Sequence, residues 1–352
     1  MRDFYVHAAD IPTLFPAVVL PYLTERRRDG YLPGYDGKPL HYAVFTPENA
    51  RKTVVISHGF TESIEKYHEA VYYFLRSGCR VWILEHRGHG HSPRAVQDPS
   101  LTHIRRFEEY TDDFALFMEE VRKDATGKPY LYAHSMGCAI ALLYMERHPD
   151  TFERAFLSSP MIVPESGGVP IPLARAVLRG ALLFGRGKKR AFISAPYTGK
   201  EAFESSCKTC RERFDEYEAI KEATPEFHTT CSTYGWAYQS LRVRKMLMKK
   251  GAPEKVGTPI LMALAGQDTT VSRPPQLALA ARLPHCTVKT YEDAKHEIFG
   301  SGDETVFPYF DDLLQFFGVG HPPAVGDPVA DGFLLTDNKT VGFPPPYCIG
   351  WA

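Results

Sequence analysis

The sequence predicts an α/β protein with a mostly parallel, doubly wound sheet and an inserted helical cap. Short apolar runs rich in Val, Ile, Leu and Tyr recur along the chain, which is typical of strands buried on both faces of a parallel sheet. Segments with helical spacing lie between these runs, so strand-helix-strand units repeat. The alternation stops after Pro160 and resumes at Pro259, which indicates an insertion with helical but no clear strand character.

The elements follow in order along the chain. Residues 1–28 have weak periodicity, and Gly30 to Phe45 is expected to form a hairpin that turns at Asp36-Gly37. A final helix is expected from Phe307 to Phe317. The remaining strands are expected at residues 53–57, 79–84, 130–133, 155–157, 259–265 and 287–291, with helices between them near residues 67–75 and 107–121.

These elements divide the chain into three parts. Residues 1–160 and 258–318 are expected to form the core, and residues 161–257, here called the cap segment, are expected to form the insertion. Residues 319–352 form a tail rich in proline and glycine, with six prolines. Aromatic residues such as Phe333 and Trp351 indicate that this tail lies against the surface or a partner.

Composition limits the possible partners and compartment. Lysine and arginine total 41 against 42 acidic residues, so no overall positive field attracts nucleic acid. Seven dispersed cysteines and no recognisable signal sequence favour a reducing, cytoplasmic location. The most apolar stretch, Ile11 to Leu23, is interrupted by three prolines and is shorter than the ~20 residues that span a bilayer. We therefore expect a soluble or peripheral protein.

Ser135 is the strongest candidate for a nucleophile. It follows the apolar run Tyr130 to Ala133 and precedes Met136-Gly137, so it is expected on a tight turn between a strand and a helix. Such a turn exposes the serine hydroxyl and leaves N–H groups of the following helix free to bind an oxyanion. Ala133 takes the place of the first glycine in the G-x-S-x-G pattern but is still small.

A serine hydroxyl needs a base and a group that orients this base. Asp268 follows the strand expected at residues 259–265, and His296 follows the strand at residues 287–291. Each residue alone has an ordinary structural explanation, as a turn, cap or surface residue. Together their types, order and positions predict a Ser135, Asp268 and His296 triad. The N–H groups of Met136 and Phe60 are the expected oxyanion donors.

With these motifs, the chain resembles the bacterial lysophospholipases and monoacylglycerol lipases of the α/β-hydrolase superfamily. The resemblance covers residues 50–160 and 255–318 well, the cap segment weakly and the tail not at all. Glu85 stands where an aspartate is usual, and Cys138 replaces a common glycine. The matching blocks are His58-Gly59-Phe60, His86 to Ser92, Asp98 to Leu101, Arg106 to Asp113, Ala133 to Gly137 and Ala294 to Ile298.

The resemblance implies an α/β-hydrolase fold and a carboxylic ester hydrolase with no metal or organic cofactor. The expected reaction releases a fatty acid from a single-chain lipid, a lysophospholipid or a monoacylglycerol, through an acyl-enzyme on Ser135. One alternative is a soluble carboxylesterase of small esters, and an amidase of the proline iminopeptidase type is less favoured. An alternative from another class is a non-catalytic ligand-binding protein with the same fold.

Two groups of residues have spacings that suggest a metal site. His86, His89 and His91 lie in one turn, but the resemblance implies that this turn is structural, with Glu85 as its only carboxylate. A second group has zinc-like spacing, yet the matching positions of the family lie on cap helices without metal. We expect no metal in either place and leave zinc open for the second group, which is Cys207, Cys210, His228 and Cys231.

The cap segment contains two further features. Residues 166–200 include no acidic residue, seven basic residues and an apolar helical face, which fits either contact with an anionic membrane or a solvated helix. Tyr234 and Trp236 are candidates to line an acyl pocket, although core packing explains them equally well.

Overall fold

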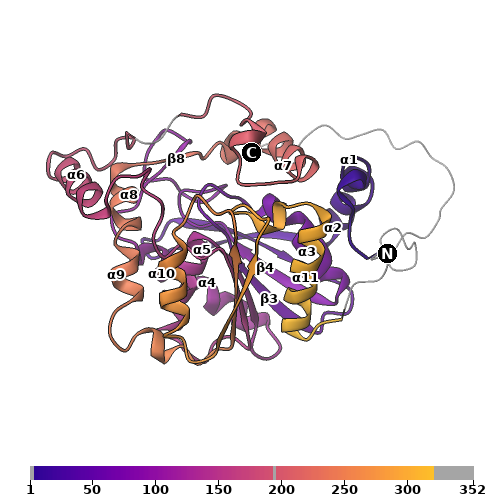
Figure 1. Cartoon of the computed structure of the whole chain (residues 1–352). Helices are drawn as coiled ribbons and strands as arrows, with labels where there is room; N and C mark the ends of the chain where they lie inside the picture. The colour runs from indigo at the N-terminus through magenta and orange to yellow at the C-terminus, as the bar shows by residue number, and fades with distance from the viewer. Residues whose placement is uncertain (1–3, 193–195, 321–352) are drawn as a thin grey trace.

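A computed structural model describes residues 4–192 and 196–320, and its centre is an eight-stranded sheet (Figure 1). The spatial order of the strands is β1-β2-β4-β3-β6-β7-β9-β10. Strand β2 is antiparallel to β1 and β4, and the other neighbours are parallel. The predicted fold class is confirmed. The strands are β1 (Arg27–Pro33), β2 (Pro39–Phe45), β3 (Lys52–Ser57), β4 (Cys79–Leu84), β6 (Tyr130–His134), β7 (Ala155–Ser158), β9 (Ile260–Ala265) and β10 (Cys286–Tyr291).

The hairpin at the edge of the sheet is longer than expected. Strand β1 begins at Arg27, three residues before the predicted Gly30, and Arg27 pairs with Phe45 at the far end of the ladder. Gly30 lies opposite Tyr42, whose ring occupies the space that a side chain at residue 30 would need. The turn contains Gly37 at a φ of 77°, a conformation that glycine adopts without strain.

Alternate strand residues face two hydrophobic clusters, one on each side of the sheet. Val55 points into a cluster with α4 (Glu108–Asp124) and α5 (Met136–Met145). Its neighbours Val54 and Ile56 point into a cluster with α3 (His68–Arg76) and α11 (Asp303–Phe317). This period of two follows from the pleat of a strand, and both faces are buried as in a parallel α/β sheet. Helix α11 begins four residues before the predicted Phe307.

The N-terminal segment packs on the second of these clusters. Its short helices α1 (Ile11–Leu14), a π-helix (Phe15–Val19) and α2 (Leu20–Arg26) follow one another directly. Pro12, Pro16 and Pro21 each stand in the first two positions of one of them, and the helix type changes just before Pro16 and Pro21, whose missing N–H groups cannot donate within a regular helix. The prolines that hid a regular period in the sequence therefore coincide with the changes of helix type along this segment.

The cap segment lies between β7 and β9 and contains α6 (Ile171–Leu183), α7 (Arg211–Ala223), α8 (Tyr234–Ser240) and α9 (Val243–Leu247). Figure 1 shows α7 above the sheet, with α6 and α8 next to each other at one side of it. The expectation that this segment has no strand is wrong in one place. The two-residue strand β8 (Cys231–Ser232) pairs with β5 (Leu101–Thr102), because residues 229–233 run along the loop that follows β4.

Two further expectations from the sequence concern the C-terminal tail and the membrane. Most of the tail, residues 321–352, lies outside the described residues, including Phe333 and Trp351. Among residues 4–192 and 196–320, no helix combines the length and apolar character that crossing a membrane requires.

Candidate active site

Ser135 occupies the sharp turn between β6 and α5. Its φ of 49° and ψ of −115° lie outside the regions that L residues normally adopt. The close packing around this turn explains the small residue two positions later, because a Cβ at Gly137 would lie 2.0 Å from the carbonyl oxygen of Ser57. The turn therefore has the backbone geometry of a nucleophile elbow.

The structure brings the three predicted triad side chains into one hydrogen-bonded line. The Nε2 atom of His296 lies 2.9 Å from the Oγ of Ser135, and its Nδ1 lies 2.8 Å from the Oδ2 of Asp268. The three residues follow β6, β9 and β10, so parallel strands deliver them to the same edge of the sheet. This is the arrangement in which a serine can lose its proton to an imidazole.

Asp268 is held in its charged form. Burial raises the pKa of its carboxyl, but the hydrogen bond and charge of His296, together with two backbone N–H donors, leave the pKa below its ordinary value. Its second oxygen, Oδ1, accepts the N–H groups of Thr270 at 2.8 Å and Val271 at 3.0 Å. The carboxylate is therefore fixed and can orient the imidazole tautomer.

The two expected oxyanion donors lie on adjoining segments. Met136 is the first residue of α5, so its N–H has no carbonyl partner within the helix. Phe60 lies in the loop after β3, and its N–H donates to no group in the described part of the chain. The start of this loop packs against α5, since a Cβ at Gly137 would also be 2.6 Å from the carbonyl oxygen of His58.

A sequence model of the serine aminopeptidase S33 family matches residues 48–303, most of the chain. The chain belongs to this hydrolase family. Lysophospholipase L2 of Escherichia coli K12 is 31% identical over 272 residues, which are 73% of this chain and 76% of that protein. The probable lysophospholipase L2 of Haemophilus influenzae is 28% identical, over 86% of this chain and 94% of its own. The predicted class, a carboxylic ester hydrolase, is confirmed.

Solved structures agree with the fold of this S33 hydrolase. A monoglyceride lipase from Saccharomyces cerevisiae superposes with a TM-score of 0.64 and 18% identity, over 83% of this chain and 94% of that one. A carboxyl esterase from Bacillus coagulans gives a TM-score of 0.63 at 20% identity, over 83% of this chain and 98% of its own. The predicted α/β-hydrolase fold is therefore confirmed.

The two aromatic pocket candidates of the S33 hydrolase lie in different surroundings. Trp236 stacks on Phe60 with ring centroids 3.8 Å apart, and its Nε1 donates to the hydroxyl of Tyr110. It therefore covers the loop that carries an expected oxyanion donor. Tyr234 instead packs against a small cluster that includes Leu178 of α6.

The four residues for which zinc was left open, Cys207, Cys210, His228 and Cys231, are not brought together in the described part of the chain. The sulfur of Cys207 contacts the hydroxyl of Thr270, whereas the sulfur of Cys210 contacts Arg213. The remaining two residues have partners elsewhere: the ring of His228 stacks on Tyr197, and Cys231 accepts a hydrogen bond from Arg190. The three histidines of the 86–91 turn also separate, because His86 and His89 pack on His58 while His91 faces Glu85.

A buried charged network beneath the site was missed by the sequence analysis. The carboxylate of Glu62 accepts the N–H of Gly59 at 2.5 Å and lies 2.9 Å from Nδ1 of His134. Lys66 lies 3.2 Å from Glu62 and 2.6 Å from Glu297. Burial acts to raise the pKa of Glu62, but Lys66 and His134 hold it well below its ordinary value.

This network connects the residues next to the proposed functional groups. Gly59 precedes Phe60, His134 precedes Ser135, and Glu297 follows His296. The sequence contains only partial signals of this network: His134 and Glu297 lie within the family motifs, and Glu62 and Lys66 are four residues apart. Contacts between segments so distant in the chain have no local signature.

Proposed function

We propose that this S33 hydrolase releases a fatty acid from a single-chain lipid ester through an acyl-enzyme on Ser135. The observation that carries the proposal is the continuous hydrogen-bonded line from Ser135 through His296 to Asp268. Nε2 of His296 accepts the proton of Ser135 as the hydroxyl attacks the ester carbonyl carbon. Asp268 keeps the proton on Nδ1 and stabilises the imidazolium that forms.

The N–H groups of Phe60 and Met136 then donate to the tetrahedral oxyanion. Collapse of this intermediate breaks the ester C–O bond, and His296 protonates the departing alcohol. Water, deprotonated by His296, attacks the acyl carbon, and the fatty acid leaves with Ser135 restored. Groups of this chain supply each of these steps, so the proposal assigns no role to a cofactor.

Similarity to named relatives supports the substrate class. The chain aligns with 94% of the probable lysophospholipase L2 and, at 30% identity, with 56% of a monoacylglycerol lipase from Mycolicibacterium smegmatis. We propose a lysophospholipid or a monoacylglycerol as substrate.

We also propose the division of the chain into a core of residues 1–160 and 258–318, the cap segment and the tail. In this division, Trp236 and Tyr234 of the cap segment line the pocket for the acyl chain of the substrate.

A panel of substrates tests this proposal. Fatty-acid release is measured for lysophospholipids, long-chain monoacylglycerols, short water-soluble esters and aminoacyl amides, with Ser135→Ala as the control. We expect the long-chain lipids to react fastest and the control to lose about 10⁶-fold in kcat. Faster cleavage of short esters would favour the soluble carboxylesterase, and faster cleavage of amides the amidase. No turnover of any ester by the folded protein would favour a ligand-binding role.

We propose further that α6 brings the enzyme to an anionic membrane surface. Only Leu178 of this helix is buried, whereas Leu183 at its end and Phe184 just after it are 78% and 85% exposed. Arg175 and Arg179 lie on the same helix, and further basic residues follow it. Exposed apolar groups among basic ones fit the interface of an anionic bilayer. The cytoplasmic location stays a prediction.

Vesicle flotation tests the membrane contact. The protein is mixed with phosphatidylcholine vesicles that contain or lack phosphatidylglycerol. We expect binding to the anionic vesicles only, lost in the Leu183→Ser, Phe184→Ser double variant. Leu277→Ser is the matched control, because Leu277 is an exposed apolar residue on α10 (Arg273–Ala280). This assignment of α6 would be contradicted if the double variant and the Leu277→Ser control bound the anionic vesicles equally, or if the wild type did not bind them.

A further inference from the structure

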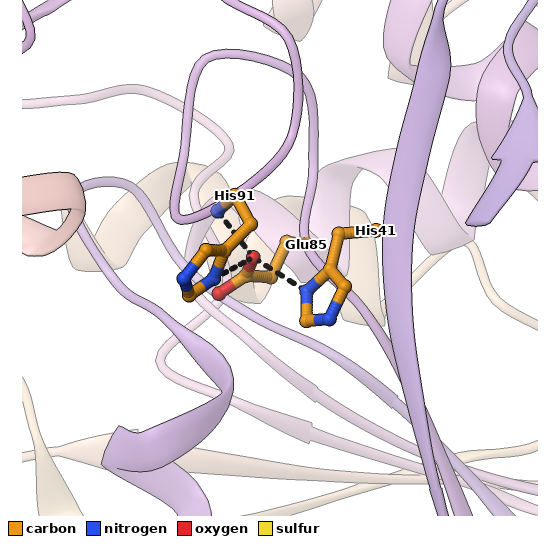
Figure 2. Close-up of side chains that lie close together, drawn as sticks. All are labelled: His41, Glu85 and His91. Atoms are coloured by element: carbon orange, nitrogen blue, oxygen red, sulfur yellow. Dashed lines mark hydrogen bonds and ion pairs between the residues drawn. The ribbon is translucent and has the colours of Figure 1, made fainter. Parts of the chain in front are cut away.

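Three side chains with metal-binding atoms converge at the edge of the sheet that carries the hairpin. His41 comes from β2, Glu85 directly follows β4, and His91 belongs to the turn after it. Figure 2 shows the two imidazole rings on either side of the Glu85 carboxylate. One ligand atom from each residue lies within 4.8 Å of the others, and the mechanism proposed above uses none of them.

We propose that this cluster binds one divalent transition-metal ion of the zinc type, through Nδ1 of His41, Nδ1 of His91 and the carboxylate of Glu85. The Nδ1 of His41 lies 2.8 Å from the Oε2 of Glu85, and the Nδ1 of His91 lies 3.4 Å from the same oxygen. Ligands about 2.0–2.2 Å from a tetrahedral zinc ion are separated by roughly 3.3–3.6 Å. Small side-chain shifts therefore suffice to admit the ion.

A fourth residue, Asp29, orients the ring of His41. Metal-binding histidines are often oriented by a carboxylate in this way. The Nε2 of His41 lies 2.8 Å from the Oδ1 of Asp29, which is itself fixed by the guanidinium of Arg27. Histidines that bind metals usually donate their second N–H to a carboxylate, which fixes the tautomer and ring orientation. Here the Asp29 contact leaves Nδ1 as the atom directed at Glu85.

The other two ligands are also prepared for an ion. The N–H of His91 donates to Oε2 of the fully buried Glu85 at 2.6 Å, which fixes the carboxylate. Gly90 makes room for it, since a Cβ there would lie 1.9 Å from the Oε1 of Glu85. The His91 side chain is 37% exposed, which gives an ion a route from solvent and leaves its fourth position to water.

The ion would join β2 to the turn of residues 86–92. In its absence a proton on Nδ1 of His41 makes the bond to Glu85, so binding releases this proton to solvent. The same turn carries His86, whose ring packs 4.5 Å from that of His58. The ion is therefore a structural brace near the loop that carries Phe60 and takes no part in ester cleavage.

Zinc titration of the metal-free, full-length protein tests the site. We expect calorimetry to give one zinc ion per chain and zinc to raise the Tm. His91→Ala should weaken binding by at least about 100-fold, and Asp29→Asn by about 10–100-fold although it removes no ligand. The matched control is His285→Ala, which removes an exposed histidine just before β10 and should bind zinc as the wild type does.

Two results would overturn the site. One is no zinc binding by the folded wild type. The other is an affinity that His91→Ala and Asp29→Asn leave unchanged, which would place any bound zinc elsewhere on the surface. Substitution with cobalt(II) is an independent test of the site. We expect the visible absorption spectrum of a tetrahedral ion, and the spectrum of an octahedral ion would contradict the proposal.

Discussion

A single buried carboxylate, Glu62, contacts two of the segments from which the candidate site is built. One oxygen accepts the N–H of Gly59, and the other faces the imidazole of His134. Lys66 then extends these contacts to Glu297. Because a shift of about 1 Å in a reacting group can lower a rate by 100-fold, we infer that Glu62 is a positioning residue for the proposed chemistry.

Replacing Glu62 with glutamine should lower kcat by about 10-fold or more, because one charge of the network is lost while the size of the side chain is kept. Stability should fall by about 3 kcal/mol, since the partners stay buried. The fall in kcat should exceed any change in KM. Glu65→Gln is the control, because the Glu65 carboxylate pairs with Arg27. An unchanged kcat in the folded Glu62 variant would remove this role.

Gly137 tests the tightness of the turn that carries Ser135. Its Cβ would meet backbone oxygens of Ser57 and His58, which no side-chain rotation can move away. Gly137→Ala should therefore cost several kcal/mol, of the order of the larger effects of overpacking. Urea unfolding measures the loss. Gly180→Ala, on α6 where no atom lies within 4 Å of the new Cβ, should be neutral or slightly stabilising. Equal stability of the two variants would contradict the packing described for the turn.

At the scale of elements, the two longest helices of the cap segment differ in their attachment. Helix α7 is fixed to the core by Arg213, whose guanidinium pairs with Glu69 and Asp303 and donates to the backbone oxygens of Val6 and Ser301. Helix α6 buries Leu178 alone and exposes its larger apolar side chains. We infer that α7 is rigidly attached to the core and that α6 is available to an external surface.

Arg213→Met should lower the free energy of unfolding by about 3–5 kcal/mol, because Glu69 and Asp303 lose the cation between them. Chemical denaturation measures this loss. Arg211→Met is the control, since Arg211 pairs with Asp215 on the exposed side of the same helix and should change stability by less than about 1 kcal/mol. A small effect at Arg213 would mean that packing alone attaches α7.

At the scale of the whole molecule, local patterns predicted the elements and chain order predicted the triad residues that the structure brings together. Apolar runs located β3 and β4 almost to the residue, because strands buried on both faces are apolar at nearly every position. The pairing of β5 with β8 and the meeting of His41 with His91 join residues far apart in the sequence. Nothing in either segment alone indicates its partner, so only the assembled fold reveals such contacts.

Because its hydroxyl is hydrogen-bonded to the imidazole of His296, Ser135 is expected to be an activated nucleophile. The most direct measurement is the intact mass of the protein after reaction with a fluorophosphonate, followed by identification of the modified peptide. We expect one adduct per chain, on the peptide that contains Ser135, and none on Ser135→Ala. A folded wild-type protein that acquires no adduct, or an adduct that persists in Ser135→Ala, would contradict it.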